Sequence, residues 1–425
     1  MNKKIRLLGV LGIVISMMFC ISGCSDNANS DAADNTSSLE NIQNIEVNNV
    51  GNSVTETTEP SIEDGFVTET AEPSIEDNST TETLKPNSQV VVTDLEPSDG
   101  LEFESNGDGT CTIVGIGTCT DKDLVIPEKS PAGDTVILID EYAFYSLEDV
   151  ESVTLMNFNY EVDKNAFQYG EFTTLNIIGG SPVIKKSAFS SCEDLTSISF
   201  SDCNIQADEY AFYSCGNDAD ITFSNCTGYI DERAFQYANF KSLTISNCEL
   251  EIDKSAFSTC EDLTSIIFTD STIKADEYAF YSCGDSANVE MNNCSITLDE
   301  RVFQYSSLES LTITGSEVEM GTSAFSSCKD LTTIKMDCSI VTLDEYAFYS
   351  CEDLISVSIC DNSELDNNIT IDDRAFQYCK RLENVAIGNG SVTIGEYVFS
   401  GCSDNLTISI AGKNYTVDSI KDGLK

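Results

Sequence analysis

The sequence DEYAFYS at Asp140–Ser146 occurs again at Asp208–Ser214, Asp276–Ser282 and Asp344–Ser350. The interval from each copy to the next is constant, since the copies start at positions 140, 208, 276 and 344. A fixed period is the signature of a repeat architecture. The chain of 425 residues is therefore predicted to form one long array instead of two or three independent globular domains.

The heptapeptide belongs to a shorter repeat, which is anchored on a phenylalanine preceded by alanine or valine. The anchors are Phe144, Phe167, Phe189, Phe212, Phe235, Phe257, Phe280, Phe303, Phe325, Phe348, Phe376 and Phe399. They lie 22 or 23 residues apart, except for a longer interval between Phe348 and Phe376. Their surroundings cycle through EYAFYS, AFQY and SAFS, with YVFSGC as the last variant. The pattern indicates a module that was duplicated in blocks of three.

Each module contains two structural signals. An apolar residue stands five positions before the phenylalanine, as at Ile184 and Ile252. The pattern Leu-x-x-Ile-x-apolar comes after the phenylalanine, as in Leu195–Phe200. The closing alternation predicts a short half-buried strand, and the AFxxC spacing places Phe and Cys on one side of a helical turn. One module buries too little to offset its chain entropy, so neighbours must stack. The predicted fold class is a repeat solenoid with a parallel β ladder on one side and short helical turns on the other.

The N-terminus has the pattern of an export signal. Three basic residues among the first six precede an apolar run, Leu7–Ile21, which is too short to span a bilayer comfortably as a helix. The sequence Ile21-Ser22-Gly23-Cys24 resembles the lipobox of bacterial lipoproteins. This resemblance implies a signal peptide over residues 1–23 and a diacylated Cys24, while Cys20 leaves with the signal. Two acyl chains make a lasting membrane anchor. The alternative is an ordinary secretory signal.

Residues 24–98 are predicted to be an acidic, disordered stalk. They are rich in Asn, Ser, Thr, Glu and Asp, and VTETTEPSIED at Val54 recurs as VTETAEPSIED at Val67. With few large apolar residues, the segment cannot bury enough surface to fold, and its negative charges repel one another. We interpret it as a spacer, with a dedicated binding motif as the alternative.

Charge and composition argue against several functions. The chain has 72 acidic and 22 basic residues and a formal net charge of −50, which repels phosphate backbones, so no nucleic-acid partner is expected. It has no histidine and no tryptophan, so imidazole can act neither as a base nor as a metal ligand. The main routes to catalysis that remain are paired carboxylates and an activated cysteine.

The repeats resemble those of a known family. IDEYAFYSLEDVESVTL (139–155) and IKKSAFSSCEDLTSISF (184–200) are similar to BspA-like leucine-rich repeats, and the segment 107–140 is similar to the strand-rich region that precedes them. The resemblance implies a β-rich N-terminal cap over residues 99–138, a solenoid of about twelve repeats over 139–410 and a C-terminal tail over 411–425. The chain departs from the family where it has aspartate in place of the usual glycine four residues before the phenylalanine.

These aspartates form the first candidate site. They are Asp140, Asp163, Asp208, Asp231, Asp253, Asp276, Asp299, Asp344 and Asp372. Carboxylate oxygens suit calcium, so the column could bind a row of ions. The preferred interpretation is structural: each aspartate caps the turn behind it and tolerates the left-handed backbone that glycine would supply. Lys185 occupies the same column, which does not fit a shared ion site.

Sixteen cysteines besides Cys20 and Cys24 form the second candidate set. One group stands three residues after the phenylalanine and a second just after the predicted strand. Because leucine, glycine, alanine or serine replaces them in sister modules, buried free thiols are the preferred interpretation. Disulfides between modules are the alternative, with Cys111 and Cys119 as the first choice. Without histidine or a nearby cation to lower a thiol pKa, no catalytic cysteine is expected.

Tyrosines recur in three rows. They are Tyr142, Tyr210, Tyr278 and Tyr346; Tyr145, Tyr213, Tyr281 and Tyr349; and Tyr169, Tyr237, Tyr305 and Tyr378. Exposed tyrosines make good protein or glycan contacts. The preferred alternative is that they cover the convex side and seal the turns. The outward strand positions are mainly Ser and Thr, which gives a smooth, hydroxyl-rich sheet.

The sequence predicts a bacterial cell-surface protein that is lipid-anchored at Cys24 and displays its solenoid for binding, with no cofactor. The expected partner is an extracellular protein or glycan, since the resemblance implies attachment to host proteins or other cells. One alternative is a structural spacer, stiffened by calcium, without a specific ligand. Another, less favoured, is a glycoside hydrolase, which needs two acids about 5–9.5 Å apart in a unique pocket. No enzymatic activity is expected.

Overall fold

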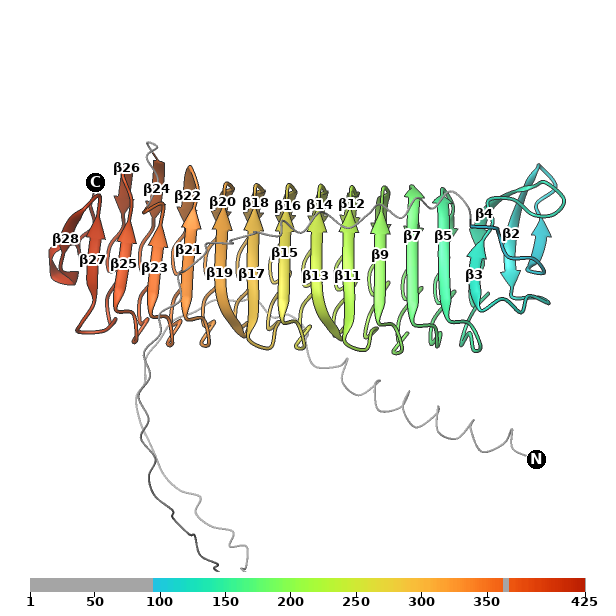
Figure 1. Cartoon of the computed structure of the whole chain (residues 1–425), viewed down its shortest axis with the longest axis horizontal. Coiled ribbons are helices and arrows are strands. Elements are labelled where there is room, and N and C mark those ends of the chain that lie inside the picture. Colours follow the sequence, from blue (N-terminus) through green and yellow to red (C-terminus); the bar gives the residue numbers. More distant parts are fainter. Residues whose placement is uncertain (1–94, 362–366, 425) are drawn as a thin grey trace, which may run out of the picture. The chain divides into compact units, whose positions relative to one another are not determined.

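The computed structural model describes residues 95–361 and 367–424. Within them the chain winds into a β-solenoid that consists of two sheets of 14 strands each (Figure 1). The predicted signal peptide, Cys24 and the stalk as far as residue 94 lie outside the described residues. No helix within the described ranges has the length and apolarity that a membrane crossing requires.

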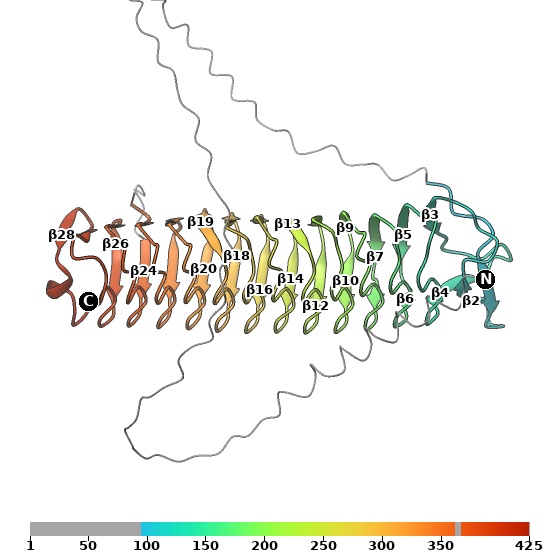
Figure 2. The ribbon, with the colours of Figure 1, turned by 90° about the horizontal axis from the view of Figure 1, so that it is seen from below.

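Each coil contributes one strand to each sheet (Figure 2). Sheet A contains β1 (Glu102–Ser105), β2 (Thr110–Gly115), β4 (Thr135–Ile139), β6 (Glu161–Val162), β8 (Val183–Ile184), β10 (Asn204–Ala207), β12 (Thr227–Ile230), β14 (Glu249–Ile252), β16 (Thr272–Ala275), β18 (Ser295–Leu298), β20 (Glu317–Met320), β22 (Ile340–Leu343), β24 (Asn367–Ile371) and β26 (Gly390–Ile394). Sheet B contains β3 (Asp123–Ile126), β5 (Ser152–Phe158), β7 (Thr174–Gly180), β9 (Ser197–Ser201), β11 (Ala219–Ser224), β13 (Phe240–Ser246), β15 (Ser265–Thr269), β17 (Ala287–Asn292), β19 (Leu308–Thr314), β21 (Thr333–Asp337), β23 (Ser356–Ile359), β25 (Asn384–Ile387), β27 (Thr407–Ile410) and β28 (Lys413–Tyr415).

The predicted solenoid is confirmed, and it has thirteen coils. Strands β2 to β26 of sheet A and β3 to β27 of sheet B are parallel, with thirteen in each set. The additional coil is built by Thr110–Ile126, which the sequence assigned to the cap and which has no phenylalanine anchor. The domain boundaries at residues 23, 98, 138 and 410 stay predictions.

In both sheets, buried apolar residues alternate with residues that face outward. In sheet B, Ile198, Ile221 and Leu243 lie in register and point into the core, while the residues between them face outward. Sheet A follows the same rule, because Leu250 and Ile252 are buried between exposed glutamates. The corner between the two strands of a coil takes a left-handed residue, usually Asn, Asp or Gly, which tolerate positive φ.

The predicted helical turns are wrong. The segment around each phenylalanine is a series of turns, and within the described residues the only helix is the 3₁₀ helix η1 (Val417–Ser419). The residues two before and two after each of the twelve phenylalanines have positive φ, for example Tyr142 (62°) and Ser146 (53°). Left-handed residues at these intervals break a right-handed helix. The turns instead form a third ladder between coils, as where the Phe144 N–H donates to the Ala166 carbonyl at 2.8 Å.

The core of the solenoid is a continuous column of phenylalanine rings. All twelve anchors are buried, and each stacks on the next at ring-centroid distances of 4.6–5.8 Å. Leucine, isoleucine and valine from the two sheets fill the space around this column. Every coil therefore completes its core with the ring of its neighbour, which fixes the stacking register.

Both ends of the solenoid are covered by a change in strand direction. At the N-terminal end β1 pairs antiparallel with β2. At the C-terminal end β28 pairs antiparallel with β27, and Leu424 bridges Ile394 of sheet A. Strands β1 and β28 cover β2 and β27, whose backbone groups would otherwise be open to pairing with other chains, whereas β3 remains the N-terminal edge of sheet B.

Candidate binding surface

Five of the nine aspartates of the column accept a backbone N–H of the turn behind them, in line with the preferred interpretation. The Asp231 carboxylate accepts the Glu232 N–H at 2.6 Å, and Asp163, Asp253, Asp276 and Asp299 make the equivalent bond. The expected left-handed backbone is absent from this column, because the positive φ falls two residues later. Lys185 lies 3.5 Å from Glu161 and 3.6 Å from Asp208. Among the described residues, no group of three or more Cys, Asp or Glu could hold a metal ion.

We expect the melting temperature to rise as the pH falls from 7 toward the raised pKa of two carboxyl groups. Burial, followed by repulsion from neighbouring carboxylates, raises the pKa of Asp231 and of Asp344. A carboxyl whose pKa is higher in the folded state destabilises the fold above that pKa, and protonation removes this penalty. Thermal unfolding of the protein and of the Asp231→Asn/Asp344→Asn double variant tests this. The rise should be smaller in the variant; an equal rise in both proteins would contradict the assignment.

The cysteine columns form hydrogen bonds between coils. All sixteen cysteines of the described residues are free, and all but Cys119 and Cys402 are buried. In the first column the thiol donates to the carbonyl of the phenylalanine in the preceding coil, as from Cys283 to Phe257 at 2.8 Å. Ser306 occupies the same column and makes the same bond to Phe280 at 2.8 Å. Burial raises the pKa of Cys192 to about 12, which keeps that thiol protonated and able to donate.

The proposed Cys111–Cys119 bridge is not formed, since both cysteines are free and Cys111 Sγ instead donates to the Asp134 carbonyl at 3.5 Å. In the second column, which follows the strands of sheet B, Cys226 donates its N–H to Cys248 Sγ at 3.2 Å, and the Cys248 N–H donates to Ser271 Oγ at 3.1 Å. The columns are therefore structural. The signal for this role is the exchange of cysteine with serine between sister coils.

Replacing Cys283 by alanine should cost about 1–3 kcal/mol of unfolding free energy, because the Phe257 carbonyl loses its thiol donor. Cys283→Ser should cost clearly less, because Ser306 already makes this bond one coil later. Urea unfolding of both variants measures the difference. Equal stability of the alanine and serine variants would show that the thiol acts only as apolar filler.

The tyrosines gather into four equivalent clusters on the turn side of the solenoid. The clusters are Tyr142, Tyr145 and Tyr169; Tyr210, Tyr213 and Tyr237; Tyr278, Tyr281 and Tyr305; and Tyr346, Tyr349 and Tyr378. In each, the middle ring meets the other two edge to face at 5.2–5.7 Å. We call these twelve residues the tyrosine face. Three coils separate equivalent clusters, which is about 14 Å at a strand spacing of ~4.8 Å.

The tyrosine side chains cover the turns only in part, because a large fraction of several of them is exposed to solvent. Tyr142 is 52 % exposed, Tyr237 50 % and Tyr305 53 %. Cations of the chain itself lie over some rings, with Lys186 Nζ 5.0 Å from the Tyr210 centroid and Arg374 near Tyr346. The sequence located the three rows, but exposure depends on the turn geometry, which it did not predict.

Eight residues of the tyrosine face adopt a backbone conformation that is unfavourable for a bulky side chain. The outer two tyrosines of every cluster have positive φ, between 58° and 63°. At the corners between the sheets the same conformation is taken mainly by Asn, Asp and Gly, which tolerate it. Tyrosine at such a position costs of order 1–2 kcal/mol, and strain of this kind clusters at functional sites. Ser, Thr, Asn and Arg take the same conformation at the equivalent positions of other turns, so it is a property of the repeat. The exposure and the regular recurrence of the rings make the tyrosine face the leading candidate for function.

A hollow of about 350 Å³ separates the second and third clusters. Its two walls are tyrosines from the clusters on either side, and its floor is the intervening coil. The lining residues are Gln236, Tyr237, Ser255, Ser258, Thr259, Tyr278, Tyr281 and Gln304. The Gln236 amide donates to Ser258 Oγ at 2.9 Å, which orders the floor. These glutamines were not predicted as site residues, although the recurring AFQY was a visible signal.

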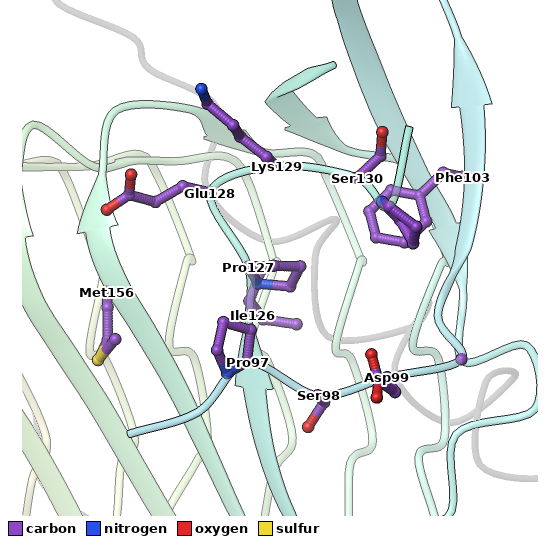
Figure 3. Close-up of a pocket in the computed structure, with 12 residues that line it drawn as sticks. Pro97, Ser98, Asp99, Phe103, Ile126, Pro127, Glu128, Lys129, Ser130 and Met156 are labelled. Carbon is purple, nitrogen blue, oxygen red and sulfur yellow. The ribbon is translucent and has the colours of Figure 1, made fainter. Parts of the chain in front are cut away.

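A second pocket, of about 400 Å³, lies at the N-terminal end of the solenoid (Figure 3). Pro97, Pro127, Ile126, Phe103 and Met156 give it largely apolar walls, and Asp99, Glu128 and Lys129 add charge. The Ser98 N–H donates to the Val125 carbonyl at 2.9 Å and attaches one wall to β3. This pocket occurs once, whereas the tyrosine face recurs with the repeat.

The outward side of sheet B is polar and smooth, as the sequence indicated. Its serines, threonines and asparagines bond to their neighbours along the array, as where Ser199 Oγ donates to Asn176 Oδ1 at 2.7 Å. Ser310 makes the equivalent bond to Asn288. These bonds occupy part of the polar surface that a partner would need, so this sheet is a weaker candidate for binding than the tyrosine face.

Comparison with known proteins identifies the class. Residues 127–238, 228–355 and 356–423 match the BspA type Leucine rich repeat region, in six copies. Because the match extends over more than half of the chain, the protein belongs to the BspA-type leucine-rich repeat family. No curated protein matches the sequence.

Among solved structures, a leucine-rich repeat protein from Bacteroides ovatus is 22 % identical, with a TM-score of 0.33, covering 72 % of this chain and 92 % of its own. A leucine rich cell surface protein from Faecalibacterium prausnitzii is 19 % identical, with a TM-score of 0.27 and coverages of 69 % and 89 %. The pneumococcal vaccine antigen PcpA is 15 % identical, with a TM-score of 0.30 and coverages of 76 % and 89 %. These likenesses are too low to bear on function.

Proposed function

We propose that this protein is a lipid-anchored bacterial surface protein whose solenoid binds an extracellular protein or glycan through the tyrosine face. The observation that carries the proposal is the recurrence of four tyrosine clusters, each with at least one ring that is 41–53 % exposed. Tyrosine offers a large rigid contact area with a polar tip, and it is enriched at binding hot spots. Equivalent clusters along a solenoid suit extended or multivalent contact.

Binding is tested with residues 25–425 on an array of extracellular matrix proteins and glycans. A matched variant carries Asn in place of Tyr169, Tyr237, Tyr305 and Tyr378, since asparagine tolerates positive φ and should preserve the fold. We expect at least one ligand to bind the unchanged protein and to bind the variant at least ~10-fold more weakly. Equal binding by both proteins, or no ligand at all, would refute a binding role for this face and favour the spacer.

The proposed location depends on Cys24, in the sequence ISGC that resembles a lipobox. In a bacterial host, the full chain should incorporate a labelled fatty acid and remain with the membrane fraction. Cys24→Ser should abolish both, whereas Cys20→Ser should change neither. Labelling that survives Cys24→Ser would disprove the assignment.

The family fold supports a binding role over an enzymatic one, since leucine-rich repeat solenoids of this kind are typically not enzymes. The repeat spreads equivalent carboxylates evenly along the array, so no single pair is marked for general acid–base work. The calcium-stiffened spacer predicts a melting temperature that rises when calcium is added and falls with a chelator. We expect no such shift, because the described aspartates accept backbone N–H groups instead.

A further inference from the structure

The hollow between the second and third clusters combines aromatic walls with a floor of hydroxyl and amide groups. Tyr237 forms one wall and is 50 % exposed, and Tyr278 and Tyr281 form the other. The floor offers the hydroxyls of Ser258 and Thr259. None of the lining residues is charged. In a chain with a net charge of −50, such a neutral lining distinguishes the hollow from its surroundings.

The same set of residues recurs at the two neighbouring junctions between clusters. The preceding junction has Gln168, Tyr169, Ser187, Ser190, Ser191, Tyr210, Tyr213 and Gln236, and the following one has Gln304, Tyr305, Ser323, Ser326, Ser327, Tyr346, Tyr349 and Gln377. The only change of residue type among the three sets is Thr259 in place of serine. Because the coils stack in register, these residues occupy equivalent places about 14 Å apart.

The chemistry of this lining matches a sugar ring. The C–H faces of a pyranose pack against aromatic rings, and its hydroxyls exchange hydrogen bonds with amides and hydroxyls. A few placed polar groups beside aromatic walls are what small-ligand sites require. Lys254 and Arg301 already lie over the Tyr278 ring, at 5.6 and 5.8 Å, so Tyr237 offers the freer stacking platform.

The net charge of the chain and the neutral lining of the hollow exclude several classes of ligand. An anionic polymer would be repelled by the net charge of the chain, and the two cations over Tyr278, Lys254 and Arg301, are already paired with Glu277. A cationic segment would find no carboxylate in the lining. A folded protein partner typically contacts about 20–30 residues, whereas eight residues line the hollow.

We propose that the hollow and the two equivalent junctions form three repeated subsites for a neutral polysaccharide, and that one extended sugar chain occupies more than one of them. The inference rests on the proposed function and specifies its ligand as an uncharged hexose polymer. Each subsite contributes a weak interaction, and their fixed spacing converts three weak interactions into avidity. Short oligosaccharides therefore bind much more weakly than the polymer.

The test compares neutral polysaccharides (glucans, mannans and galactans), sulfated or uronic-acid polymers and matrix proteins as ligands for residues 25–425. The variant Tyr169→Asn/Tyr237→Asn/Tyr305→Asn removes the free wall of each subsite. Tyr397→Asn is the matched control, because Tyr397 is 42 % exposed, has positive φ and lies outside the tyrosine face. Tyr237→Phe keeps the ring and removes one hydroxyl. Circular dichroism and thermal unfolding establish that each variant is folded.

We expect at least one neutral polysaccharide to bind, the triple variant to bind it ~100-fold more weakly, and Tyr397→Asn to bind it within about threefold of the unchanged protein. Tyr237→Asn alone should lose about tenfold and Tyr237→Phe far less. A ligand that depends on the tyrosines but is a protein or a charged polymer would overturn the inference and leave the proposed function standing. Neutral polysaccharides that bind the triple variant equally well would overturn the inference, and no ligand of any class would overturn both.

Discussion

Replacing Phe257 by alanine is expected to lower the free energy of unfolding by about 3–5 kcal/mol. Phe257 is fully buried and stacks on Phe235 at 4.8 Å and on Phe280 at 5.2 Å. Removal of the ring opens a gap in the phenylalanine column. The coil that carries the substitution and both neighbouring coils therefore lose packing contacts. Chemical denaturation followed by circular dichroism measures the loss.

Ile340→Ala is the matched control. Ile340 is also a large apolar side chain, but it lies on the outward side of β22 and is 41 % exposed. Its replacement should change stability by no more than about 0.5 kcal/mol. If Phe257→Ala cost no more than this control, the phenylalanine column would not be the core of the fold.

Deletion of Asp231–Leu298 is expected to leave a folded solenoid that is three coils shorter. The deletion removes one full period of the DEYAFYS repeat and joins Ile230 to Asp299. Ile230, Ile252, Ala275 and Leu298 occupy one register position in sheet A, so the new junction reproduces a natural one. Because three of thirteen coils are lost, the denaturant m-value should fall by about a quarter.

A deletion that is out of phase with the repeat should have a far larger effect. Removal of Asp231–Glu309 takes away the same period together with about half of the next coil, and it joins Ile230 to Ser310. The coil at the junction then lacks its phenylalanine and its turn. The solenoid loses its register there, and the parts on either side should melt separately or fail to fold. Equal stability of the two deletion proteins would contradict stacking by register.

The sequence was sufficient to predict the solenoid because its strongest signal is also its main packing interaction. The twelve phenylalanines that define the period are the twelve stacked rings of the core. The strands of sheet B followed from the alternation in segments such as Leu195–Phe200. Both predictions depended on apolar side chains at fixed intervals, which periodicity detects directly.

Sheet A was missed, although its signal was present. Leu250 and Ile252 alternate with glutamates just before the turn, but four residues are a short run. The helical turns were predicted because Phe and Cys have helical spacing, and this spacing carries no information about φ. Twelve non-glycine residues at the position two before the phenylalanine take the left-handed conformation, among them Arg233 and Tyr278, which do not favour it.

The candidate surface was predictable only as rows of residues. Spacing placed the tyrosines at equivalent points of successive coils, but their exposure follows from the left-handed turns. The hollow forms because a coil with small Ser or Thr side chains lies between two coils with tyrosines. This arrangement is visible only once the coils are stacked. The roles of the cysteines likewise required the distance from Cys283 Sγ to the Phe257 carbonyl.

The central claim is that a coil folds only when neighbouring coils stack against it. An isolated block of three coils tests this claim most directly. The segment 208–275 comprises one complete period, from the start of one DEYAFYS copy to the residue before the next. Circular dichroism and amide hydrogen exchange should show a chain without cooperative melting or protected amides. Each of the two outer coils in this fragment has lost one of the two coils that stack against it. A cooperative melting transition in this fragment at the temperature of the full array would contradict the account.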